Sequence, residues 1–68
     1  MFEKIPQSYE EFRMKLELLG SDTFPRRNIV EFAMKDPDLW KRFAGAVEWR
    51  LRNGMSLEHM NLLNVGFL

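Results

Sequence analysis

The 68-residue chain has no cysteine, and this absence excludes several kinds of chemistry. Without cysteine there is no disulfide, no thiolate metal ligand and no cysteine nucleophile. The single histidine, His59, excludes paired-histidine metal sites within one chain. No stretch approaches the ~18 consecutive apolar residues of a membrane span, and residues 1–6 hold no apolar run long enough for a signal peptide. We therefore expect a cytoplasmic protein without a membrane segment.

Catalytic and ion-binding motifs are also missing. The turn Gly20-Ser21-Asp22 lacks the further glycines and the lysine of a phosphate-binding loop. Asp36 and Asp38 lack the additional oxygen ligands and the glycine of a calcium loop. Because no spacing suggests a nucleophile, a base and an orienting group, we expect no enzymatic activity, no cofactor and no metal site.

The chain has no excess of charge of one sign. Its ten basic and ten acidic side chains cancel, although acidic residues predominate over residues 1–25 and basic ones over residues 26–52. A nucleic-acid-binding domain usually carries a strongly basic face. This composition therefore makes nucleic acid a less favoured partner than protein, and solvated helix faces account for the uneven charge.

Apolar residues, in contrast, are plentiful enough for a packed core. Hydrophobic residues make up 46% of the chain and aromatic residues 13%, which argues against disorder. A chain of this length forms one small domain, spanning residues 1–68. Turn and capping residues divide it into four segments with helical patterns, so we expect an all-α fold, a compact orthogonal bundle of four short helices.

Capping residues predict where the first two helices begin and end. Ser8 and Glu11 have the spacing of a capping box at the start of the first helix, which ends near Gly20. Side-chain oxygens of residues 21–23 are expected to cap the second helix, with Pro25 in its first turn.

The last two helices are predicted in the same way. Asp36 caps a third helix that begins at Pro37 and closes at residues 53–54, and Ser56 begins a fourth helix. The apolar spacing places Trp40, Phe43 and Val47 at the centre of the core. The other expected buried positions of the first three helices are Tyr9, Phe12, Leu16, Leu19, Ile29, Val30, Phe32, Ala33, Leu39, Ala46 and Leu51.

Arg50 is a charged residue within the apolar stripe of the third helix. We expect it to extend its charge to the edge of the stripe or to pair with an acidic residue such as Glu17 or Glu31.

Trp49 does not belong to that stripe. At about 100° per residue it lies on the opposite side of the third helix, beside Arg42, Gly45 and Arg52. Tryptophan and arginine are enriched among interface hot spots, and glycine permits close backbone approach. These four residues are therefore predicted to bind a partner protein. The alternative is that Trp49 packs under the N-terminal segment or against the fourth helix.

Two other apolar surfaces are candidates for contact. Met14 and Leu18 lie four residues apart on the side of the first helix opposite its main stripe. They are either covered within the fold or form a second edge of the binding surface. At the C-terminal end, Phe67 and Leu68 are expected to close the core or to mediate homo-oligomer formation.

Part of the sequence resembles the YozE-type SAM-like helical domains. The similar residues are Ser8 to Phe12, Asn28 to Ala33 and Asp36 to Trp40, and the similarity covers residues 8–64. The resemblance implies a four-helix, SAM-like fold without catalytic activity.

A second resemblance involves the Hha/YmoA family of nucleoid-protein modulators. Asp22-Thr23, residues 43–46 and Arg50-Leu51 are similar to positions in that family. The resemblance implies an H-NS-type partner, and Glu48 is then the counterpart of an acidic residue that takes part in binding.

The favoured function is therefore a protein–protein interaction module, a small regulator or inhibitor that occupies a surface of its partner. The alternative is a nucleic-acid-associated transcription or nucleoid regulator that contacts phosphates through Arg26, Arg27, Lys41 and Arg42. A third possibility is a self-assembling structural protein that associates through its C-terminal tail.

Overall fold

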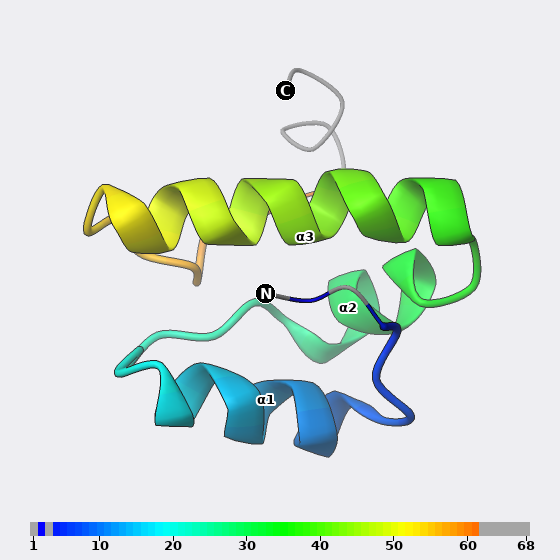
Figure 1. Cartoon of the computed structure of the whole chain (residues 1–68), viewed down its shortest axis with the longest axis horizontal. Coiled ribbons are helices and arrows are strands. Elements are labelled where there is room, and N and C mark those ends of the chain that lie inside the picture. Colours follow the sequence, from blue (N-terminus) through cyan, green and yellow to red (C-terminus); the bar gives the residue numbers. More distant parts are fainter. Residues whose placement is uncertain (1, 3, 62–68) are drawn as a thin grey trace.

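The computed structural model describes residue 2 and residues 4–61. These residues form three helices and no strand: α1 (Tyr9–Leu18), α2 (Arg27–Ala33) and α3 (Pro37–Arg52). Figure 1 shows α3 along one side of the molecule and α1 along the other, with the N-terminal segment between them. The predicted all-α class is confirmed for the described part of the chain.

Helix α1 begins at the predicted cap. The Ser8 hydroxyl oxygen accepts the Glu11 N–H at 3.2 Å, while a Glu11 carboxylate oxygen accepts the Gln7 N–H at 2.9 Å. This is a capping box whose acidic side chain reaches one residue further back than the standard form. After the helix, Gly20 has φ +91°, which is the left-handed conformation expected of a terminating glycine.

The predicted start of α2 is wrong. The helix begins at Arg27, its N-cap Arg26 makes no side-chain capping bond, and Pro25 is buried ahead of it. The Thr23 hydroxyl, expected near the cap, accepts the Leu57 N–H at 2.9 Å. A distant segment of the chain therefore uses the oxygen that local spacing had assigned to the helix.

Helix α3 follows its prediction at both ends. The Asp36 carboxylate accepts the Asp38 N–H at 2.9 Å, Pro37 occupies the first helical position, and the chain turns at Gly54 with φ +67°. Its sixteen residues present the predicted apolar stripe to the core.

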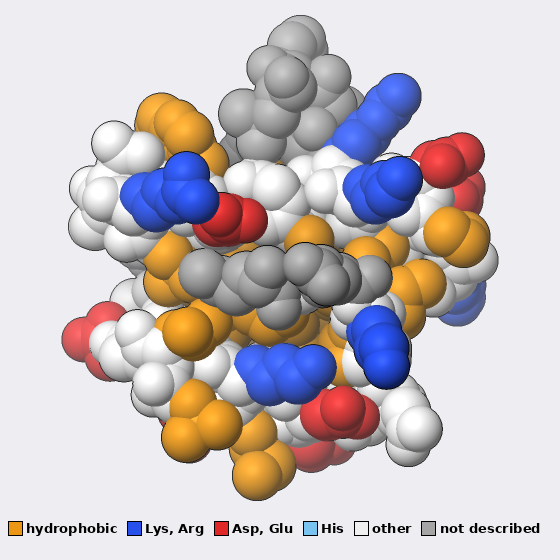
Figure 2. All heavy atoms as spheres, in the orientation of Figure 1, with side chains coloured by type: hydrophobic (Ala, Val, Ile, Leu, Met, Phe, Trp, Pro, Cys, Tyr) orange, Lys and Arg blue, Asp and Glu red, His pale blue; other side chains and the backbone are white. Residues whose placement is uncertain are grey.

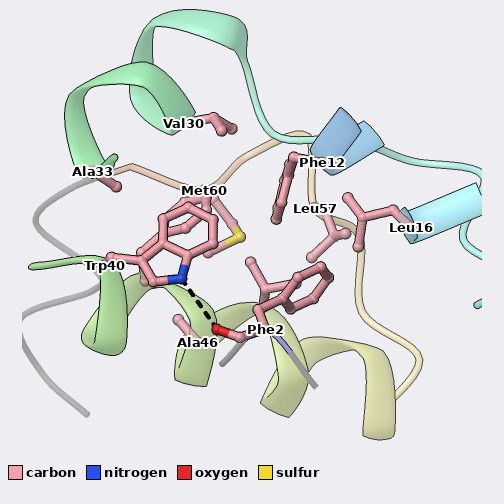
Figure 3. Packing of buried hydrophobic residues seen from close by; sticks show 11 residues of the cluster. Phe2, Phe12, Leu16, Val30, Ala33, Trp40, Ala46, Leu57 and Met60 are labelled. Atoms are coloured by element: carbon pink, nitrogen blue, oxygen red, sulfur yellow. Dashed lines mark hydrogen bonds between the residues drawn. The ribbon is translucent and has the colours of Figure 1, made fainter. Parts of the chain in front are cut away.

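The core joins all three helices to the two flanking segments. Trp40, Phe43 and Val47 lie at its centre, as predicted. Phe2 inserts from the N-terminal segment, with its ring 5.1 Å from that of Phe12, and its carbonyl oxygen accepts the Trp40 indole N–H at 3.1 Å (Figure 3). The buried hydrophobic residues are Phe2, Phe12, Leu16, Val30, Ala33, Trp40, Phe43, Ala46, Val47, Leu57 and Met60.

The fourth helix is not formed at its predicted start, because residues 55–61 are irregular. Leu57 and Met60 are nevertheless buried, and the segment is held where Arg50 donates a guanidinium N–H to the Ser56 carbonyl at 2.8 Å. Of the two roles expected for Arg50, pairing with an acidic residue is not seen among the described residues. Instead of the predicted four-helix bundle, the described residues form three helices followed by an irregular segment, residues 55–61, which we call the closing segment. Phe67 and Leu68 lie outside the described residues.

Two buried positions were also predicted wrongly. Phe32 is 52% exposed and Leu19 is 49% exposed. Val30 and Ala33 define the buried side of α2, and Phe32 lies more than 100° away from it around the helix. Leu19 follows the last residue of α1 and does not continue the helical stripe.

Candidate protein-binding surface

The outer face of α3 is the side turned away from the core. Since Trp40, Phe43, Ala46 and Val47 are buried, helical geometry places the midpoint of the opposite side at Gly45. The members of this outer face are Asp38, Lys41, Arg42, Gly45, Glu48, Trp49 and Arg52. Four of them are the predicted partner-binding residues of this helix, and the structure brings them together.

Trp49 is 50% exposed, whereas Trp40 on the same helix is 2% exposed. The Asn53 side-chain amide donates a hydrogen bond to the Trp49 carbonyl oxygen at 2.7 Å. This bond involves the backbone of Trp49 and not its indole ring. The indole N–H makes no hydrogen bond within the described part of the chain. Half of a large aromatic side chain is thus available on a surface that is otherwise polar.

Gly45 lies in the middle of the outer face and has an ordinary helical conformation. A Cβ added there would meet no atom of the described residues within 4 Å. Glycine inside a helix costs roughly 0.5–1 kcal/mol relative to alanine. Neither internal packing nor backbone geometry of the described residues therefore requires glycine at this position.

The charges of the outer face are unevenly compensated. Arg52 and Glu48 form an ion pair with an N–O distance of 2.5 Å. Lys41 and Arg42 are exposed and form no ion pair among the described residues. Figure 2 shows basic and acidic side chains next to each other in the upper part of the view, where α3 lies. Asp38 lies one turn before Lys41 and Arg42 on the same face, so the outer face carries three basic and two acidic side chains.

Met14 and Leu18 form a separate apolar surface. They are 63% and 86% exposed, so no described part of the fold covers them. Together with Leu19 and Lys15, Leu18 also borders a shallow depression of about 200 Å³ that reaches Phe2. The outer sides of α1 and α3 point in opposite directions (Figure 1). The structure therefore does not join Met14 and Leu18 to the surface around Trp49.

The basic residues of the nucleic-acid alternative are also separated. Arg27 is bound to Glu10 at 2.8 Å, approaches Glu31 at 3.7 Å and lies over the Tyr9 ring at 4.8 Å. The hydrogen bond from Arg27 lowers the pKa of the Glu10 carboxyl, and the same bond raises the pKa of the guanidinium. The Arg27 charge is therefore already paired with acidic side chains of this chain.

Arg26, the neighbouring residue, lies beside a different depression, next to Ile29, Glu58 and His59. Arg26 and Arg27 thus border different surface depressions, and each depression also contains an acidic residue. They do not form the continuous basic face that phosphate contacts require.

A catalytic or metal-binding arrangement is not seen in residue 2 and residues 4–61. No three histidine or acidic side chains are grouped so that they could hold a metal ion within that range. His59 is exposed next to Glu58, and the sequence holds no other histidine. Of the helices in this range, none is long and apolar enough to cross a membrane.

Sequence reasoning missed one exposed aromatic residue. Phe32 on α2 is as accessible as Trp49, and its distance around the helix from Val30 and Ala33 was the signal that could have found it. Comparison with known proteins found no matching family model, no similar curated protein and no similar solved structure.

Proposed function

We propose that this chain is a non-catalytic protein-interaction module, a small regulator or inhibitor that occupies a partner surface with the outer face of α3. The observation that carries the proposal is Trp49, whose indole is half-exposed on a helix that buries its other tryptophan. The contact of a large apolar indole ring with water is unfavourable, and burial of the ring in an interface removes that apolar area from water.

The neighbours of Trp49 support the same function. Arg42 and Arg52 supply planar donors for acidic or carbonyl groups of a partner. Gly45, which no described contact requires, allows a partner backbone to approach α3 closely. A hot-spot aromatic residue surrounded by polar groups is the usual anatomy of a protein interface.

Capture from a nuclease-treated lysate, with tagged wild-type protein and Trp49→Ala, tests this proposal. We expect a protein partner to be retained by the wild type and its affinity to fall by about 2 kcal/mol or more in the variant, because the central contact is lost. The melting temperature should change little, since the ring is outside the core.

Phe32→Ala is the matched control, because Phe32 has almost the same exposure but lies on α2. It should retain the partner. Equal binding by Trp49→Ala and the wild type would contradict the proposal, and a collapse of thermal stability in Trp49→Ala would show that the ring supports the fold.

The nucleic-acid alternative makes a different prediction in the same experiment. If recovery depends on nucleic acid, it should vanish after nuclease treatment and affinity should fall steeply with salt concentration.

A SAM-like arrangement and a cytoplasmic location are also proposals. The resemblance over residues 8–64 supports the first, and the cysteine-free composition supports the second.

A further inference from the structure

The side chain of Phe2 occupies a site formed by aromatic rings of two helices. Its ring centroid lies 5.1 Å from that of Phe12 on α1 and 6.5 Å from that of Trp40 on α3, edge-on to the indole (Figure 3). We call the site formed by these two rings the aromatic slot. The Phe2 carbonyl oxygen accepts the Trp40 indole N–H at 3.1 Å. The slot therefore binds one aromatic side chain together with the backbone carbonyl of the same residue.

The segment that carries Phe2 has few other attachments to the helices. Residues 4–8 are irregular and, except for the buried Pro6, exposed. Within the described part of the chain, residues 4–6 make no hydrogen bond, and the first bond toward α1 runs from the Gln7 N–H to the Glu11 carboxylate. Withdrawal of Phe2 from the slot thus breaks the hydrogen bond with Trp40 and unwinds no helix.

The aromatic slot also has an opening to the surface. Phe2 borders the shallow depression of about 200 Å³ at the end of α1, together with Lys15, Leu18 and Leu19. Leu18 and Leu19 are exposed there. A side chain from outside the molecule therefore meets an apolar surface directly beside the slot.

From these features we infer that the aromatic slot is an exchangeable docking site, which a second copy of this chain fills with its own Phe2. The second copy is the occupant because its segment carries the same ring and the same carbonyl that the slot already binds. Each copy fills the slot of the other, so the exchange closes as a twofold-symmetric dimer. Both slots stay filled, and the small core keeps its buried aromatic surface. The exchange uses none of the residues proposed for partner binding on α3.

Protein concentration decides between the monomer and the exchanged dimer. A segment joined to its own slot by a short connection has an effective concentration on the order of mM. We therefore expect the monomer at micromolar concentrations and the exchanged dimer at concentrations near or above ~1 mM.

Refolding at two concentrations tests this inference. An equal mixture of isotope-labelled and unlabelled full-length protein is denatured, refolded at about 1 mM and studied by isotope-filtered NMR. We expect contacts between the Phe2 ring of one copy and the Phe12 ring of the other, and a dimeric mass by sedimentation. The sample refolded at a hundredfold lower concentration should be monomeric. A monomer at both concentrations overturns the inference, and so does a dimer whose Phe2–Phe12 contacts stay within one copy.

A peptide of residues 1–8 tests whether the slot accepts the segment from outside. Added to full-length Phe2→Ala, it should raise the melting temperature and shift the NMR signal of the Trp40 indole N–H toward its wild-type position. The same peptide carrying Phe2→Ala is the matched control and should do neither. If the Phe2→Ala protein does not fold, Phe2→Leu takes its place, because leucine keeps an apolar side chain. No response to the wild-type peptide overturns the inference.

Leu18→Ser separates exchange from ordinary association through the exposed side of α1. Leu18 lies beside the slot and is 86% exposed, so the variant should still form the exchanged dimer. The Phe2→Ala protein should form none. Loss of the dimer in Leu18→Ser, with a dimer retained in Phe2→Ala, would identify the surface of α1 as the interface and overturn the inference.

Discussion

At the scale of single residues, glycine has two different roles in this protein. Gly54 has φ +67°, a conformation that residues with a side chain rarely adopt, and it allows the turn after α3. Gly45 lies inside α3 and does not have a positive φ. A Cβ added to it would have no neighbour within 4 Å among the described residues. The fold therefore requires the first glycine, whereas the described residues give no packing reason for the second.

We therefore expect Gly45→Ala to stabilise the free protein by roughly 0.5–1 kcal/mol, because alanine restricts the unfolded chain and favours the helix. The melting temperature should rise by several degrees, as a change of about 1 kcal/mol shifts a domain of this size by ~4–8 °C. Thermal unfolding followed by circular dichroism measures this.

Gly54→Ala is the opposing control. It should lower the melting temperature, because residue 54 has a left-handed backbone conformation that is unfavourable for alanine. A lower melting temperature for Gly45→Ala as well would mean that the fold needs glycine at both positions.

At the scale of secondary-structure elements, α1 and α2 are linked by a polar cluster at the surface. Arg27 on α2 binds Glu10 on α1, while the Tyr9 hydroxyl donates to the Pro25 carbonyl at 2.9 Å. Tyr9 also lies beneath the Arg27 guanidinium. One arginine of α2 thus contacts two adjacent residues of α1 through an ion pair and a ring contact.

This link predicts a pH dependence. The pKa of Glu10 is lowered from its ordinary 4.5 by the hydrogen bond from Arg27, so the folded state favours the ionised carboxylate. The resulting stabilisation is present above the ordinary pKa and is lost as the pH falls through the lowered value. The effect should be small, because both groups are exposed and screened by solvent.

Titration of the Glu10 carboxyl by NMR should give a pKa below 4.5 in the wild type and a value closer to 4.5 in Arg27→Gln. An unchanged Glu10 pKa in Arg27→Gln would contradict the assigned cause.

Helix boundaries show how far local sequence predicts these elements. Asp36 and Pro37 predicted the start of α3 correctly, because both act on the adjacent backbone. The start of α2 was predicted wrongly, because Thr23 forms its bond with Leu57, which is 34 residues away. Trp49 was placed correctly on the outer side of α3 by periodicity alone. Phe32 was misplaced because α2 is too short for one stripe to dominate, although its angle from Val30 and Ala33 indicated the exposed side.

At the scale of the whole molecule, the core is completed by segments that are not helical. Phe2 fills the space between α1 and α3, and Leu57 and Met60 contribute from the segment after α3. Periodicity could not identify these residues, because isolated apolar residues in irregular segments have no repeating pattern. In a domain this small, such segments provide burial that three short helices alone lack.

We expect Leu57→Ala to destabilise the protein by about 2–5 kcal/mol, through lost burial and a cavity in the core. A domain of this length has little stability in reserve, so a substantial unfolded fraction is expected at moderate temperature. Chemical denaturation followed by circular dichroism measures the change.

Met55→Ala is the matched control in the same segment, because Met55 is 44% exposed. Its effect should stay within about 0.5 kcal/mol. Equal stability of the two variants would show that the closing segment does not contribute to the core.

The contrast between the two tryptophans has a spectroscopic consequence. Trp40 is enclosed by aromatic rings and Trp49 is in contact with solvent, so a soluble quencher such as iodide reaches mainly Trp49. The emission that iodide removes reports on the outer face of α3, and the remaining emission reports on the integrity of the core. A single fluorescence sample can thus follow docking and unfolding as separate signals, without any attached dye.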